Sequence, residues 1–246
     1  MYPIMIVLTA SLMAGLSTGL GALPALLGEF SEEIMDLLLG FSAGVMLAAT
    51  AFSLLVPAME ISNPIIAALG LLLGTAVLHI LDRMIPHLHP VAGPEGPPSK
   101  LAKVWLFIIA MTLHNFPEGV AVGVSFGMGD VATGLVVATA IGLQNAPEGL
   151  AVALPLVRER YSRWRAVGYA TLTGLVEPLG ALLGFFIVSL AHALLPWGLT
   201  FAAGAMLFIV VDEMVPESHE KGFGRKATFG LIIGFTLMMV LDNLLK

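Results

Sequence analysis

The sequence predicts an all-α fold, a polytopic membrane bundle of eight transmembrane helices that forms a single domain over residues 1–246. Of its residues, 58% are hydrophobic and only 11% are charged, with a mean hydropathy of +0.95. A soluble domain carries about 25% charged residues. The apolar runs are also long enough to cross about 30 Å of hydrocarbon, which takes about 20 helical residues.

Charged residues and Pro/Gly clusters interrupt the apolar sequence and divide it into spans. The first run has no Lys or Arg ahead of it, so we expect a retained span and not a signal peptide. The polar stretch 158–165 separates the fifth span from the sixth. The predicted spans are 3–27, 37–58, 63–84, 103–127, 131–156, 165–190, 194–215 and 226–245.

Basic residues predict the orientation of these spans. All Lys and Arg except Lys246 lie in or beside the third, fifth and seventh loops, which share one face. By the positive-inside rule that face is cytoplasmic and both termini are extracellular or periplasmic. The expected location is the inner (plasma) membrane. The third loop, 85–102, contains Pro90, Pro94, Pro97 and Pro98, which predicts a flexible cytoplasmic segment.

Composition also narrows the function. The chain has no cysteine, which excludes disulfides, thiolate metal sites and cysteine redox chemistry. The net charge of -6 is spread over loops and intramembrane acids, so we expect the lipid bilayer as a partner and no nucleic acid.

One polar motif occurs twice within the apolar spans. His114-Asn115-Phe116-Pro117-Glu118-Gly119 lies in the fourth span, and Gln144-Asn145-Ala146-Pro147-Glu148-Gly149 follows thirty positions later in the fifth. A charge at bilayer centre costs about 2.5–3.5 kcal/mol even on insertion scales. Helical spacing places the first two polar side chains of each copy beside its Glu. Because the two spans are antiparallel, the copies are expected to face each other near the midplane.

A third acid, Glu177, is predicted at similar depth in the sixth span. Three carboxylates without a nearby Lys or Arg favour a bound cation. Imidazole with carboxylate and amide oxygens suits zinc, iron or manganese, whereas all-oxygen ligation favours magnesium or calcium. The alternative, hydrogen-bonded groups that only stabilise helix kinks, does not account for the duplicated spacing.

Further polar residues gather toward the predicted cytoplasmic face. Those at the ends of the third and seventh spans are either solvated helix ends or an exit path for a cation: His79, Asp82, Asp212, Glu213, Glu217 and His219. In the third loop, His87 and His89 belong either to a plain linker or to a metal-catching segment.

The paired motif, followed by Gly174-Leu175-Val176-Glu177-Pro178-Leu179-Gly180, resembles the ZIP (Zrt-, Irt-like) divalent metal transporters over essentially the whole chain. Gln144 stands where most members of the family have His. In this respect the chain is similar to the GufA-like branch. The resemblance implies a 3+2+3 helix arrangement and a two-metal centre. Its first site would use His114, Glu118, Gln144, Glu148 and Met46, and its second Asn115, Glu118, Asn145, Glu148 and Glu177, with Glu118 and Glu148 bridging.

The expected function is therefore transport of a divalent transition metal from outside into the cytoplasm, with Zn²⁺ as substrate and no organic cofactor. Cd²⁺, Fe²⁺ and Mn²⁺ are further expected substrates, and a homodimer is one option for assembly. Two other functions stay open at this stage. One is a metal-gated channel or sensor. The other is an intramembrane metallohydrolase, against which the chain lacks a His-Glu-x-x-His helix.

Overall fold

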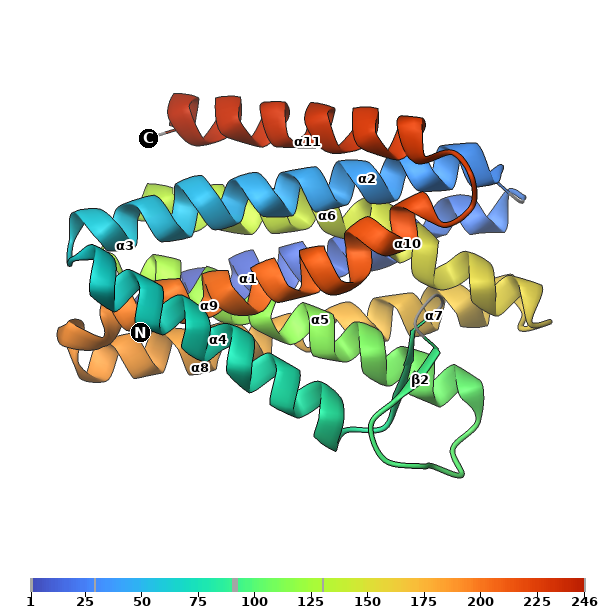
Figure 1. The fold of residues 1–246 in the computed structure, drawn as a ribbon, viewed down its shortest axis with the longest axis horizontal. Coiled ribbons are helices and arrows are strands. Elements are labelled where there is room, and N and C mark those ends of the chain that lie inside the picture. The colour runs from blue at the N-terminus through green and yellow to red at the C-terminus, as the bar shows by residue number, and fades with distance from the viewer. Residues whose placement is uncertain (1, 29, 90–92, 130, 246) are drawn as a thin grey trace.

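A computed structural model describes residues 2–28, 30–89, 93–129 and 131–245. Within these residues eight helices are long and apolar enough to cross a membrane, which confirms the predicted all-α class. The helices lie side by side, and both ends of the chain lie at the left end of the bundle in Figure 1. The spans are Ile4–Leu26, Glu32–Glu60, Pro64–Met84, Lys103–Phe126, Val131–Arg158, Arg163–Leu190, His192–His219 and Gly224–Leu244.

The elements of these spans, and two short strands between the third and fourth, follow in chain order. They are α1 (Tyr2–Ala22), η1 (Leu23–Leu26), α2 (Glu32–Ala48), η2 (Ala49–Leu55), α3 (Val56–Glu60), α4 (Pro64–Met84), β1 (His87–His89), β2 (Gly93–Glu95), α5 (Lys103–Phe126), α6 (Val131–Arg158), α7 (Arg163–Gly174), α8 (Glu177–Leu190), η3 (His192–Leu194), α9 (Leu195–Ile209), η4 (Val210–Met214), α10 (Val215–His219) and α11 (Gly224–Leu245).

Polar side chains cap the starts of α2 and α4. Ser31 accepts a hydrogen bond from the Ile34 amide, so the second span begins at Glu32 and not at the predicted 37. Asn63 caps α4 through the amides of Ile65 and Ile66, each at 3.0 Å. These side chains satisfy amides that the helix itself leaves without partners.

Four spans are not continuous α-helices, and the first of these ends in the 3₁₀ segment η1. The second and seventh contain π-helical segments, η2 and η4, and each segment is followed by a Val-Pro pair. The sixth span, predicted as one run over 165–190, divides between Gly174 and Glu177. Pro178 has no amide hydrogen to donate at the first turn of α8. Glu177 consequently starts a helix instead of lying inside one.

Glycine sets the close helix contacts, because it lets two helix backbones approach each other. A Cβ added at Gly15 of α1 would lie 2.2 Å from the Gly174 carbonyl oxygen of α7. One at Gly44 of α2 would lie 2.0 Å from the Leu231 carbonyl oxygen of α11. Similar contacts join α5 to α8, α6 to α1, and α4 to α9. The motif-bearing helices α5 and α6 thus pack closely on α8 and α1.

A short β-hairpin interrupts the helical fold between α4 and α5. Strands β1 and β2 are antiparallel, with His87 opposite Glu95, and the hairpin lies at the other end of the bundle from the termini (Figure 1). The Pro- and Gly-rich composition of 85–102 did not predict regular structure. Gly93 and Gly96 adopt φ of +86° and +73°, which other residues rarely tolerate, and so allow the turns. Pro90 lies outside the described residues, and flexibility of this loop stays a prediction.

Candidate metal centre

The two copies of the motif meet in the interior of the bundle. Gln144 Nε2 on α6 donates a hydrogen bond to Glu118 Oε1 on α5 at 2.7 Å. Both side chains are fully buried, with 0% of their surface exposed. The helical spacing of each motif and the antiparallel direction of its helix therefore place the two polar faces against each other.

Glu148 is held by a residue that sequence reasoning missed. Ser42 Oγ, on α2, lies 2.6 Å from Glu148 Oε1 and 3.0 Å from the carbonyl oxygen of Gln144. A serine in an apolar helix commonly bonds a carbonyl of its own helix. The position of Ser42 in the sequence therefore did not predict its contact with Glu148. Met46 is fully buried one helical turn farther along α2 than Ser42.

Glu177 joins the cluster from the break in the sixth span. Asn145 Nδ2 donates to Glu177 Oε1 at 2.6 Å and to the carbonyl oxygen of Ala14 at 3.0 Å. A Cβ at Gly119 would lie 2.2 Å from the Glu177 carbonyl oxygen, so glycine is what lets α5 approach the start of α8. The acid predicted from its depth alone thus lies beside the second motif.

Several buried polar atoms of the motif residues have no hydrogen-bond partner among the described residues. Oxygens of this kind are expensive to bury, and native structures satisfy nearly all of them. A bound cation would satisfy the oxygens on the list, whereas the Asn115 amide nitrogen needs an acceptor instead. The atoms are both Oδ1 and Nδ2 of Asn115, Oε2 of Glu118, Oε1 of Gln144, Oδ1 of Asn145 and Oε2 of Glu177.

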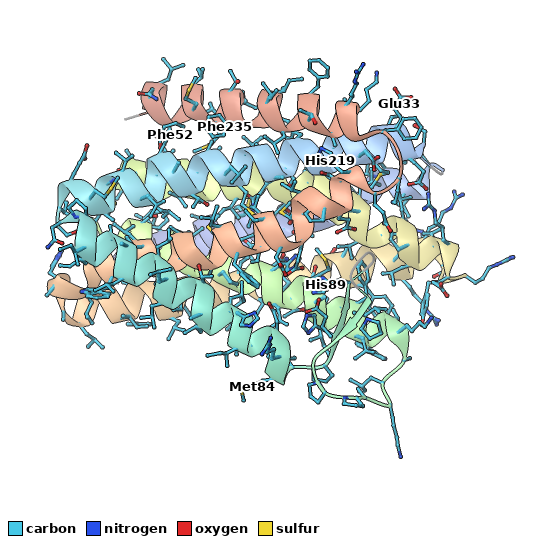
Figure 2. The ribbon with its side chains drawn as sticks, in the orientation of Figure 1. Glu33, Phe52, Met84, His89, His219 and Phe235 are labelled. Carbon is cyan, nitrogen blue, oxygen red and sulfur yellow. The ribbon has the colours of Figure 1, made fainter. Side chains whose placement is uncertain are left out.

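His114 points from the motif toward the hairpin end of the bundle. Its Nε2 shares a short hydrogen bond with Glu213 Oε2 of η4, and His89 Nδ1 lies 2.7 Å from the same oxygen. The rings of His89 and His114 stack with centroids 5.7 Å apart. All three side chains are buried, and their donor atoms lie within 4.8 Å of one another. Figure 2 shows His89 where the hairpin meets the helices.

A small cavity adjoins the motif on the same side. It has a volume of about 20 Å³ and is lined by His114, Glu148 and Glu217 with five apolar residues. One water-sized species needs about 10–15 Å³, so the cavity has room for one. Glu217 of α10 and two motif residues thus line one cavity, and the exit path stays a prediction.

The remaining candidates divide into two groups. Asp82 is buried, and its Oδ1 lies 3.9 Å from His87 Nε2. Asp212, His79 and His219 are exposed. The His79 ring contacts Phe208, and His219 Nε2 lies 3.1 Å from Thr228 Oγ1 on α11. The structure therefore does not bring these three to the motif, because helical rotation turns them outward.

Comparison with known proteins places the chain in a family. The family model described as ZIP zinc transporter matches residues 92–242. The chain is 49% identical over 246 residues to "Zinc transporter GufA" of Myxococcus xanthus, covering 96% of this chain and 97% of that protein. It is 46% identical to "Zinc transporter ZIPB" of Bordetella bronchiseptica, covering 93% of this chain and 78% of the relative. "Zinc transporter ZIP11" of Homo sapiens is 32% identical, with 93% of each chain covered. The chain belongs to the ZIP zinc transporter family.

Proposed function

We propose that the protein transports divalent transition metal, with zinc as its main substrate, from outside into the cytoplasm through a binuclear site at mid-depth. The observation that carries the proposal is the set of buried motif side chains with unpartnered polar atoms on α5, α6 and α8. The matched relatives are named as zinc transporters, which supports the choice of metal. Transport, not hydrolysis, is also the activity for which the family is named.

Each site takes ligands from both motif copies. The first uses His114, Glu118, Gln144 and Glu148, with Met46 beside it. The unpartnered Oε1 of Gln144 is the atom that it offers to the metal. The second uses Asn115, Asn145 and Glu177, together with the same two glutamates as bridges. Because Gln144 supplies oxygen where imidazole is common in the family, the first site is harder, so Fe²⁺ and Mn²⁺ are also accepted. Cd²⁺ is accepted as a mimic of Zn²⁺.

The exit runs from His114 toward the hairpin. His114 bonds Glu213, and Glu217 lies across the small cavity from His114 and Glu148. Metal leaves by exchange from the motif to these acids and then to His89 and Asp82 at the end of the bundle. The route omits Asp212, His79 and His219, whose side chains lie on the exposed faces of their helices.

The orientation follows from charge. The chain ends lie together at one end of the bundle and the hairpin at the other (Figure 1). Lys and Arg are concentrated in the loops at the hairpin end, which supports a cytoplasmic hairpin and external termini in the inner (plasma) membrane. In the 3+2+3 arrangement α5 and α6 are the two middle spans.

The test is metal uptake into proteoliposomes, with Zn²⁺, Cd²⁺, Fe²⁺, Mn²⁺ and Mg²⁺ offered separately. We expect saturable uptake of transition metals that is lost in Glu118→Ala and kept in Glu159→Ala, a matched change of an exposed acid. Saturation separates a carrier from the alternative, a metal-gated channel, which would give single-channel currents. Equal uptake by Glu118→Ala and the unaltered protein contradicts the proposal.

A further inference from the structure

A groove runs along the outside of the bundle between α1 and α6. It has a volume of about 680 Å³ and is lined by α1 from Met5 to Ser17 and by α6 from Leu135 to Leu143. The α1 stretch rises about 18 Å, which is close to half of a bilayer core about 30 Å thick. The groove therefore extends over about one leaflet, at the end of the bundle that holds the N-terminus (Figure 1).

The groove has apolar edges and small residues between them. Its edges carry exposed side chains of two membrane spans, namely Met5, Met13, Leu135 and Leu143. Between these edges lie residues with little or no side chain, namely Ala10, Ala14, Ala138 and Gly142. Neither stretch contains a charged residue, and the polar side chains of the lining, among the described residues, are three hydroxyls. The groove is thus continuous with the surface that bilayer hydrocarbon covers, and it has no charge to bind a lipid headgroup.

Gly142 keeps the groove open at a position where helix packing does not require glycine. A Cβ added at Gly142 would lie 3.3 Å from Ser17 Oγ and 3.7 Å from the Cα of Ala14, so a side chain needs only a small shift of the serine. At the other glycines of α1 and α6 a Cβ would come within 2.4 Å of a neighbouring helix: Gly15, Gly19, Gly21, Gly134 and Gly149. Those five glycines bring helices together, whereas the missing side chain of Gly142 leaves space for a molecule outside the fold.

The width of the groove favours a hydrocarbon chain over another helix. Spread over about 18 Å, its volume corresponds to a channel about 6–7 Å wide, whereas a helix with its side chains is about 10–12 Å across. A helix of a second copy would pack on the small residues only by bringing its backbone close to them. The exposed Met and Leu side chains on both edges hold such a backbone away.

We propose that the groove holds one acyl chain of a phospholipid, from the leaflet at the N-terminal end of α1, and that this lipid stays bound to the protein. Because the lining is uncharged, the lipid is selected by its acyl chain and not by its headgroup. Ala14 lies beside the acyl chain, and its carbonyl oxygen accepts a hydrogen bond from Asn145 Nδ2 at 3.0 Å. The bound lipid therefore covers the stretch of α1 that orients Asn145. Lipid binding here does not depend on transport by the mid-depth site.

The test is native mass spectrometry of the purified full-length protein after exchange in detergent into one defined phospholipid at a time. We expect one palmitoyl-oleoyl lipid per protein, retained equally as phosphatidylglycerol and as phosphatidylethanolamine, and none with hexanoyl chains. Gly142→Leu fills the groove and should lower the retained fraction about tenfold or more, because displacing even two buried CH₂ groups costs about that much. Gly168→Leu on α7 is the matched control and should keep the lipid, because a Cβ there meets nothing within 4 Å.

Ala10→Leu, from the α1 side of the groove, decides the question if Gly142→Leu does not fold. Retention that is unchanged in the folded groove-filling variant overturns the proposal, and so does retention that depends on the headgroup. A photoreactive group on the acyl chain should mark residues 5–17 and 135–143, and labelling spread evenly over α4 and α11 contradicts the assignment. Cross-linked dimers that Gly142→Leu abolishes, without any retained lipid, would assign the groove to a second copy and overturn it too. None of these readouts measures Zn²⁺ uptake, so failure here is distinguishable from failure of the proposed transport function.

Discussion

His114 and Glu213, ninety-nine positions apart in the chain, share a buried hydrogen bond that joins the motif of α5 to the π-helical segment of the seventh span. His114 is the motif's imidazole, and Glu213 also contacts His89 of the hairpin. His114, a ligand of the proposed first site, is therefore bonded to Glu213, the first residue of the proposed exit. His114 can bind a metal through Nε2 only by leaving Glu213, so the pair couples occupation of the site to the exit.

Glu213→Gln tests this coupling. The change keeps the shape of the side chain but removes the charge that attracts a cation leaving His114. We expect the maximal uptake rate to fall about tenfold, which is about 1.4 kcal/mol in the barrier, with little change in the KM for Zn²⁺. Asp212→Asn is the matched control, because the neighbouring acid is exposed. Unchanged rates in Glu213→Gln would remove Glu213 from the exit path.

Ser42→Ala tests the support of Glu148. The change removes the hydroxyl that donates to Glu148 Oε1. A hydrogen bond to a charged group contributes about 1.5–3 kcal/mol. We expect a lower Tm and a several-fold higher KM for Zn²⁺, because Glu148 is no longer held in place. Ser125→Ala is the control: Ser125 is equally buried but bonds only a carbonyl of its own helix, Ala121, and should leave the KM unchanged.

Met46→Ala separates a ligand role from packing. The sequence from Phe41 to Leu47 recurs in similar form from Phe201 to Leu207, and it places Met206 on α9 where Met46 stands on α2. Both methionines are fully buried. Truncation of either should destabilise the fold by about 2–5 kcal/mol. Only Met46→Ala should lower uptake of Cd²⁺, which prefers sulfur ligands, relative to Zn²⁺. Equal effects of the two variants would assign Met46 to packing alone.

Much of this architecture follows from periodicity and composition. Apolar length and the positions of charged residues predicted the eight spans, and the antiparallel motif copies predicted that Glu118 and Gln144 would face each other. Such features are local or symmetric, because they depend on a single helix or on one pair of helices. The ligand sets and the direction of transport stay predictions.

Features that depend on distant contacts were not predictable. The Ser42–Glu148 bond joins residues 106 positions apart, and the packing of α2 on α6 decides it. The β-hairpin that buries His87 and His89 arose from a Pro- and Gly-rich stretch whose composition is typical of irregular loops. The outward direction of His79 and Asp212 depends on helix rotation. Helix rotation is set by the neighbouring helices, and charge content alone did not reveal it.

Gln144→His tests how far one ligand sets metal preference. Imidazole is a better zinc ligand than an amide oxygen, so the variant should bind Zn²⁺ more tightly and discriminate more strongly against Mn²⁺. We expect the KM for Zn²⁺ to fall several-fold, measured in proteoliposomes beside the KM for Mn²⁺. Gln144→Ala is the control for loss of the amide, because it removes the donor to Glu118 without adding a nitrogen. An unaltered Zn²⁺/Mn²⁺ ratio in Gln144→His would place Gln144 outside the first site.

Uptake should weaken as the external pH falls. Carboxylate and imidazole ligands bind metal only when they are deprotonated, so protons compete with Zn²⁺ for Glu118, Glu148 and His114. The expected result is a KM for Zn²⁺ that rises steadily from pH 7.5 toward pH 5, about tenfold per pH unit at most for each proton displaced. The maximal rate at saturating Zn²⁺ should change much less, because high metal concentration overcomes simple competition.

Glu118→Gln is not informative for this pH dependence, since it removes the site. The same pH series in Glu159→Ala therefore serves as the control. Uptake that increases when only the outside is acidified would show that protons drive the transport, and it would contradict simple competition at the mid-depth carboxylates.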